Sequence, residues 1–184
     1  MIIDKFLWTA RALAYKPLLK NIGFPSYIGN PLNIIGYKKI SIGKNVRIYP
    51  NIRLEVHGKN SKVIIEDDVG IAQNVHITCN GKLVIGKGSV ILANVFITNI
   101  DHDYSQIDVP LLRQKQILKE TRIGENCFIG IGAAIQAGTI LGKQCIVGTN
   151  SVVRGEFPDY CVIAGNPAKI IKQYNFDTKK WERI

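Results

Sequence analysis

The stretch IGENCFIGIGAAIQAGTILGKQCIVGTNSVV, residues 123–153, repeats an aliphatic residue at every sixth position. A period of six matches neither the 3.6-residue period of an α-helix nor the two-residue period of a simple β-strand. It suits short strands joined by turns, each of which points one aliphatic side chain into a common interior. Three such strands complete one triangular coil, and successive coils stack through parallel hydrogen bonds about 4.8 Å apart.

The same frame runs through most of the chain. Its positions are Ile42, Ile48, Leu54, Ile65, Ile71, Ile77, Ile85, Ile91, Ile97, Ile123, Ile129, Ile135, Leu141, Val147 and Val153. Longer steps follow Leu54, Ile77 and Ile97, each after a third repeat, so the inserted segments should all leave the solenoid at one corner. The pattern predicts an all-β solenoid of about five triangular coils. Within it, Cys127 and Cys145 hold equivalent positions and should stack as buried free thiols.

The segments outside the repeat are short. Residues 4–20 show helical spacing, with Asp4 placed as the N-cap and Pro17 as the end. Apolar residues line one face of this helix: Phe6, Leu7, Ala10, Leu13 and Ala14. We expect that face to pack over the first coil, and the alternative is contact with an anionic membrane through Trp8 and nearby basic residues. The chain thus divides into an N-terminal helix with an irregular link (1–40), a solenoid domain (41–172) and a short C-terminal tail (173–184).

The charge balance restricts the partners. Lys and Arg outnumber Asp and Glu by 24 to 14, which gives a formal net charge of +10 and favours anionic partners. The basic residues are dispersed without interleaved aromatic residues, so nucleic acid is not an expected partner. No segment approaches the roughly 18 apolar residues of a membrane span, and we expect a cytoplasmic location. The four cysteines lack metal-ligand spacing, so no metal site is expected.

The longest interruption of the repeat is a loop over residues 101–121. Long loops on a rigid scaffold often carry functional residues. This one opens with a histidine between two carboxylates, namely Asp101, His102 and Asp103. The root of this loop is therefore the predicted location of the catalytic residues.

The other two histidines are weaker candidates for a catalytic role. His57 lies in the polar insertion EVHGKNSK, and we interpret it as a solvated side chain. The frame places His76 on a different face of the coil from His102, with no acidic cluster around it. Three histidines in unrelated positions also disfavour a zinc protein of the carbonic anhydrase type.

The repeat, together with the ending AGNPAKIIK at residues 164–172, resembles the hexapeptide-repeat acyltransferases and, among them, the bacterial sugar and polysaccharide O-acetyltransferases. The resemblance implies a left-handed parallel β-helix, acetyl-CoA as acyl donor, and a homotrimer whose sites are shared between subunits. It also implies that His102 is the general base. Asp101 or Asp103 would hold the imidazole in one tautomer, and the sequence leaves open which of them does so.

The same resemblance assigns further residues. Asn80 and Tyr104 fall at acceptor positions, although relatives have an acidic residue where this chain has Asn80. Contact with coenzyme A is implied for Ile131, Thr149, Arg154, Gly155, Lys169 and Lys172. The two lysines would approach its nucleotide end.

The function implied by the resemblance is O-acetylation of a sugar hydroxyl in the synthesis of a surface polysaccharide such as O-antigen or capsule. Two alternatives stay open. One is N-acetylation of a nucleotide-linked amino sugar, and the other is a non-catalytic scaffold. Peripheral contact with the inner face of the cytoplasmic membrane, or with a lipid-linked glycan, is also left open.

Overall fold

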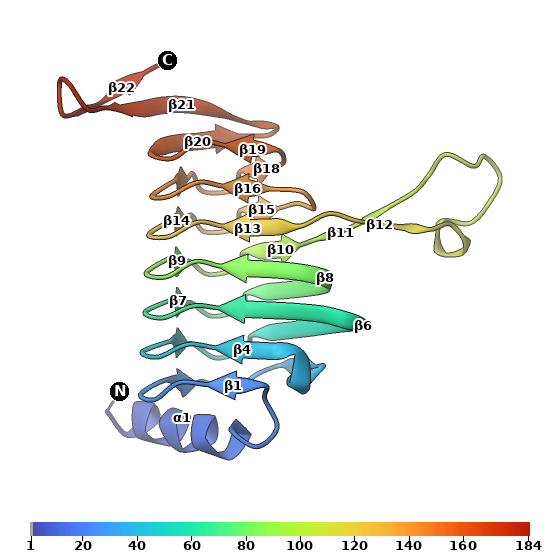
Figure 1. The fold of residues 1–184 in the computed structure, drawn as a ribbon, viewed down its shortest axis with the longest axis vertical. Helices are drawn as coiled ribbons and strands as arrows, with labels where there is room; N and C mark the ends of the chain where they lie inside the picture. Colours follow the sequence, from blue (N-terminus) through green and yellow to red (C-terminus); the bar gives the residue numbers. More distant parts are fainter. Residues whose placement is uncertain (1) are drawn as a thin grey trace.

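Short strands stacked on one another make up most of the protein. The computed structural model describes residues 2–184, with side chains from residue 4 onward. Helix α1 (Ile2–Tyr15) lies across the lower end, and the chain then climbs coil by coil to the C-terminus at the upper end (Figure 1). Parallel strand pairing joins each coil to the next, so the fold is the parallel β-helix that the repeat predicts.

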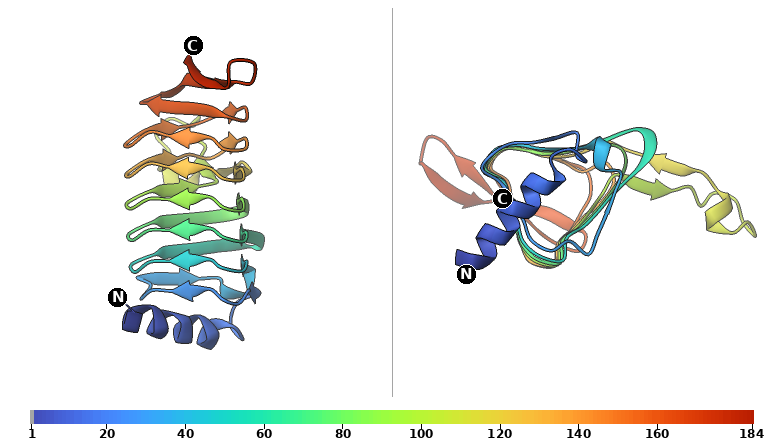
Figure 2. Two further views of the ribbon diagram at one scale, coloured as in Figure 1. Left: turned by 90° about the vertical axis from the view of Figure 1, so that its left-hand side faces the viewer. Right: turned by 90° about the horizontal axis from the view of Figure 1, so that it is seen from below.

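Three faces run along the stack, and the coils overlie one another as a triangle when seen along the axis (Figure 2). The first face holds β1 (Asn21–Ile22), β4 (Ile40–Ile42), β13 (Thr121–Ile123), β16 (Ile140–Leu141) and β19 (Glu156–Phe157). The second face holds β2 (Tyr27–Ile28), β5 (Arg47–Ile48), β7 (Gly70–Ile71), β9 (Val90–Ile91), β14 (Phe128–Ile129), β17 (Ile146–Val147) and β20 (Cys161–Gly165). The third face holds β3 (Asn33–Ile35), β10 (Phe96–Thr98), β15 (Ala134–Ile135) and β18 (Val152–Val153). The long strands β6 (Arg53–Ile65) and β8 (His76–Ile85) turn the corner from the third face to the first and serve both.

The core is the aliphatic frame of the sequence. Every frame position from Ile42 to Val153 is buried, and equivalent residues of successive coils pair in register. The glycine that often follows a frame residue allows coils to approach closely. A Cβ atom added to Gly86 would lie 2.6 Å from the backbone of Gly124 in the next coil, so no larger residue fits there. The thiols of Cys127 and Cys145 are buried and free as expected, and Cys161 extends the stack with its sulfur 3.5 Å from that of Cys145.

The solenoid starts earlier than the repeat led us to expect. Residues 21–35, interpreted as an irregular link, form a complete first coil that pairs in parallel with the coil above. Ile22, Ile28 and Ile34 supply its frame residues at the six-residue spacing. Pro25 stands in a turn, so it interrupts no strand. The Gly and Pro residues of this segment mark corners rather than an irregular link.

Helix α1 packs with a different face from the expected one. Trp8 packs against Tyr27 at a tilt and against Tyr49 edge-on, with ring centroids 5.7 and 5.6 Å apart, and Ala12 is buried. The guanidinium of Arg11 donates to the carbonyl oxygen of Ile28 at 3.1 Å. The apolar residues predicted to pack, Phe6, Leu7, Ala10, Leu13 and Ala14, are exposed. The tyrosines of the first two coils pack better against Trp8 than against the aliphatic side chains of the helix, because aromatic rings gain from edge contacts with one another.

All insertions leave the stack at the corner between the third and first faces, as the spacing predicts. A 3₁₀ turn, η1 (Tyr37–Lys39), lies there in the lowest coil, with the bends of β6 and β8 above it. Above these, residues 99–120 form a projecting segment that we call the arm (Figure 1). In the arm, β11 (Ile100–His102) pairs antiparallel with β12 (Gln116–Leu118), and the 3₁₀ turn η2 (Leu111–Arg113) lies beyond them.

The C-terminal segment is a hairpin rather than a loose tail. Strand β21 (Ala168–Asn175) pairs antiparallel with β20 and with β22 (Lys180–Arg183), so the second-face sheet continues past the last coil. This hairpin points away from the arm, on the other side of the axis (Figure 2). Within residues 2–184, no helix has the length and apolar character needed to cross a membrane.

Candidate active site

A cleft of about 550 Å³ lies between the third face and the root of the arm. Its walls combine residues from several coils of the solenoid with residues of β11 and β12. They are His57, Thr78, Phe96, Thr98, Ile100, Asp101, His102, Gln116, Gln136, Ala137 and Arg154. A rigid stack thus supplies the floor of the cleft, and the arm supplies one side.

Hydrogen bonds between side chains and backbone groups fix the arm root to the solenoid. The buried Asn99 accepts a hydrogen bond from the backbone N–H of Asn80 at 2.8 Å and donates to the carbonyl of the same residue at 2.9 Å. At the returning end of the arm, the hydroxyl of Thr121 donates to the carbonyl of Thr98 at 2.9 Å. These bonds hold both ends of the arm, and with them the position of β11.

His102 is the last residue of β11 and pairs in register with Gln116 of β12. Its side chain is half-buried in the cleft wall. The Nδ1 atom of its imidazole is buried and has no hydrogen-bond partner among the described residues. Burying a polar atom without a partner is costly, and here no group of the described chain holds the imidazole in one tautomer.

The two flanking carboxylates bind elsewhere and make no hydrogen bond to the His102 imidazole. Asp101 accepts the backbone N–H of His102 through Oδ1 at 2.9 Å, and its Oδ2 accepts a hydrogen bond from Arg154 at 2.8 Å. Asp103 accepts the backbone N–H of Ser105 at 2.9 Å, and this bond holds the pKa of Asp103 below its usual value. In this structure, then, the carboxylates shape the arm and do not select a tautomer.

His57 is exposed, as its interpretation as a solvated side chain implies, and it also lines the edge of the cleft. It pairs in register with Asn80 at the corner below the arm. A signal for this was present in the spacing, because insertions that share a corner must stack. Asn80 itself binds its own chain: its Oδ1 accepts from Ser61 at 3.3 Å, and its Nδ2 donates to Gln116 at 3.0 Å.

His76 lies on the third face below the cleft, whereas His102 lies on the arm strand β11. Its ring packs at a tilt of 56° against Phe96, a cleft residue, with centroids 5.2 Å apart. Its Nε2 is 3.4 Å from a carboxylate oxygen of the buried Glu55, which also accepts hydrogen bonds from Arg53 at 2.7 Å and Asn33 at 3.0 Å. Burial acts to raise the pKa of Glu55, but these donors outweigh it and hold that pKa below its usual value. The acidic partner comes from the coil below, where the sequence around His76 does not reveal it.

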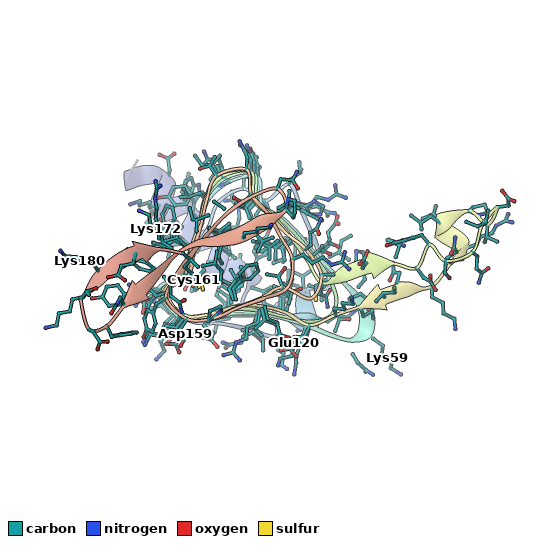
Figure 3. All side chains as sticks on the ribbon, turned by 90° about the horizontal axis from the view of Figure 1, so that it is seen from above. Lys59, Glu120, Asp159, Cys161, Lys172 and Lys180 are labelled. Carbon is teal, nitrogen blue, oxygen red and sulfur yellow. The ribbon has the colours of Figure 1, made fainter. Side chains whose placement is uncertain are left out.

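The residues assigned to coenzyme A are dispersed within one chain. Arg154 lines the cleft, and Gly155 follows it with a left-handed φ of 111°. Ile131 and Thr149 follow second-face strands, at the opposite edge of the third face from the arm. Lys169 and Lys172 lie on β21, and Figure 3 shows Lys172 on the hairpin, on the other side of the solenoid from the arm. Tyr104, assigned to the acceptor, is exposed on the arm outside the cleft.

Comparison with known proteins gives one consistent result. Residues 120–155 match the family described as bacterial transferase hexapeptide (six repeats). The chain is 35% identical over 169 residues to the Escherichia coli K12 protein named "Putative lipopolysaccharide biosynthesis O-acetyl transferase WbbJ", which covers 88% of this chain and 83% of that protein. Its fold is similar to that of AntD, an N-acyltransferase from Bacillus cereus solved with dTDP and 3-hydroxybutyryl-CoA (TM-score 0.77, 20% identity, 91% and 90% of the two chains). It is also similar in fold to a galactoside acetyltransferase solved with coenzyme A (TM-score 0.59, 20% identity, 95% and 74% of the two chains).

Proposed function

This chain belongs to the bacterial hexapeptide-repeat transferase family, and we propose that it moves an acetyl group from acetyl-CoA to a sugar hydroxyl. The name of its relative WbbJ supports an acceptor in surface polysaccharide synthesis. One observation carries the proposal: His102 lies at the arm root beside a cleft, and its buried Nδ1 has no partner among the described residues.

The chemistry suits an imidazole in this position. A sugar hydroxyl is a weak nucleophile at neutral pH, and a thioester is already activated. His102 accepts the hydroxyl proton as the oxygen attacks the thioester carbonyl, so that a C–O bond forms and the C–S bond breaks. The imidazolium then returns the proton to the departing sulfur, which leaves His102 neutral for the next turnover.

Asp101 is assigned a positioning role in this mechanism. Its two oxygens join the backbone of His102 to Arg154 in a higher coil, so the ion pair fixes the height of His102 above the third face. Arg154 therefore acts through Asp101, in addition to any contact with acetyl-CoA. Asp103 shapes the turn that follows.

We also propose a homotrimer with sites shared between subunits. The arm projects from the stack and carries exposed apolar side chains, among them Ile107 and Leu112. A two-stranded hairpin is marginally stable alone, which favours a neighbouring subunit as its support. That neighbour would bring Ile131, Thr149 and the two lysines to the cleft, and cyclic symmetry would build three equal sites.

Mixing two inactive variants tests the shared site. His102→Ala removes the base, and Thr149→Trp blocks the opposite edge with a large ring. Mixed oligomers should regain partial activity, because some clefts combine an intact arm with an intact edge. Absence of recovery after verified subunit exchange, or a fully active monomer, would contradict the shared site.

The acceptor is tested by following the release of coenzyme A. The panel contains simple glycosides, polysaccharide repeat units and nucleotide-linked amino sugars. We expect turnover on hydroxyl acceptors, with loss of turnover in His102→Ala. The fold similarity to AntD makes N-acylation the second candidate. Turnover confined to nucleotide-linked amino sugars would select it and overturn O-acetylation.

A further inference from the structure

The outward face of helix α1 is an apolar stripe at the lower end of the solenoid. Phe6 is 73% exposed, Leu7 is 55% exposed and Leu13 is 52% exposed. The opposite face, with Trp8 and Ala12, already packs on the coils. Scattered apolar side chains are normal on a protein surface, but these three share one face of one helix and have no cover in the described chain.

The stripe continues onto the first coil. Leu13 lines a small hollow together with Lys16 and Phe24, which is 65% exposed. Leu18, just after the helix, is also exposed. The apolar patch thus spans α1 and the turn between β1 and β2, and it is larger than one helix face.

Most of the excess positive charge lies at the same end. Residues 1–44 contain seven basic residues and one acidic residue, so they carry +6 of the net +10. The basic residues are Lys5, Arg11, Lys16, Lys20, Lys38, Lys39 and Lys44, and the acidic residue is Asp4. An apolar patch with a basic surround is a combination that suits an anionic bilayer.

Other occupants fit less well. Two copies meeting end to end would bring together two regions that each carry +6, and this repulsion opposes such a pair. A nucleic acid would use the charge but not the exposed Phe and Leu side chains. We propose that the α1 end of the solenoid binds the surface of an anionic lipid bilayer, with Phe6, Leu7 and Leu13 inserted at the interface.

This orientation places the cleft above the membrane. The arm leaves the fourth coil, three steps above the first, which is about 15 Å at the spacing of parallel strands. The thickness of the helix adds roughly 10 Å. Combined with the proposed function, on which this consequence alone rests, the orientation favours an acceptor sugar attached to a lipid of that bilayer.

Co-sedimentation of the full chain with lipid vesicles tests the proposal. We expect at least about tenfold stronger partitioning onto vesicles that contain phosphatidylglycerol than onto pure phosphatidylcholine. The triple variant Phe6→Ser/Leu7→Ser/Leu13→Ser should lose at least about tenfold on the anionic vesicles. Its melting temperature should not fall, because the packed face of α1 is intact. Ile184→Ser, an exposed apolar residue at the opposite end, is the matched control and should bind normally.

The charge is tested separately with Lys5→Gln/Lys16→Gln/Lys20→Gln, which should weaken binding to anionic vesicles most strongly at low salt. Wild-type protein that stays in solution with both vesicle types would overturn the proposal, as would a triple serine variant that binds like wild type. The serine variant should keep its kcat on a water-soluble acceptor. Failure of vesicle binding would therefore leave the proposed function untouched.

Discussion

The substitution Asn99→Ala tests whether the arm root positions the chemistry. Asn99 is buried and makes two hydrogen bonds with the backbone of Asn80, at 2.8 and 2.9 Å. Each is worth about 1–1.5 kcal/mol, so the variant should lose about 2–3 kcal/mol of arm stability. At 1.4 kcal/mol per factor of ten, arm amides should exchange hydrogen roughly 30- to 150-fold faster. The packed coils should change less, because the arm contributes little to their core.

Activity should fall along with arm order. A displacement of about 1 Å in a catalytic group can cost roughly 10²-fold, so we expect kcat to drop at least about tenfold. Hydrogen exchange over residues 100–118 and coenzyme A release measure the two effects in one preparation. Asn99→Asp keeps an acceptor for the Asn80 N–H but loses the donor, and it should be impaired as well.

The exposed Asn30→Ala, far below the arm, is the control and should resemble wild type in both measurements. Faster arm exchange with an unchanged kcat would refute the idea that the Asn99–Asn80 hydrogen bonds position His102. Unchanged hydrogen exchange of the arm amides would refute the idea that these hydrogen bonds hold the arm in place.

Three further changes give distinct signatures. His102→Ala should lower turnover by roughly 10²–10⁴ with an unchanged melting curve, and His76→Ala should lower it far less; the reverse ranking would contradict the assignment of the base. Lys169→Ala and Lys172→Ala should raise the KM for acetyl-CoA with kcat nearly constant, and a donor lacking the 3′-phosphate should show a smaller penalty; equal penalties would reduce both lysines to surface charges. Burial acts to raise the pKa of Glu55, but hydrogen bonds from an arginine and an asparagine hold it below the unfolded value of about 4.3. Its contribution to stability is therefore complete above that pH and lost as pH falls through the lower folded pKa, so Glu55→Gln should flatten the acid side of the urea-unfolding profile; an unchanged profile would refute this role.

The repeat predicts the solenoid because its period has one structural solution. Each frame residue must point inward, and burial from Ile42 to Val153 confirms it. The first coil is harder to predict, because Pro25 and the nearby glycines obscure the six-residue spacing of Ile22, Ile28 and Ile34. In this solenoid, the six-residue spacing of aliphatic residues predicts the start of the first coil better than the Gly and Pro content does.

The site was harder to predict because its contacts cross coils. The sequence around His102 suggests Asp101 or Asp103 as its partner, yet Asp101 binds Arg154 from a higher coil and Asp103 binds the backbone of Ser105. In the same way, His76 meets Glu55 from the coil below. Pairings of this kind depend on the register between distant segments. They can be predicted only if the six-residue frame is used to place the exposed residues of each coil as well as the buried ones.

The ladder of coils is open in principle at both of its ends. Stacked parallel strands present unpaired amides and carbonyls to whatever comes next, and a second molecule could continue the stack as it does in a fibril. Here α1 lies beneath the first coil, and β21 runs antiparallel across β20 at the top. The second-face sheet then ends on β22, a short strand that carries Lys180, Glu182 and Arg183. A short, charged and antiparallel edge does not match the parallel coil of a second molecule, so it disfavours continued stacking at this end.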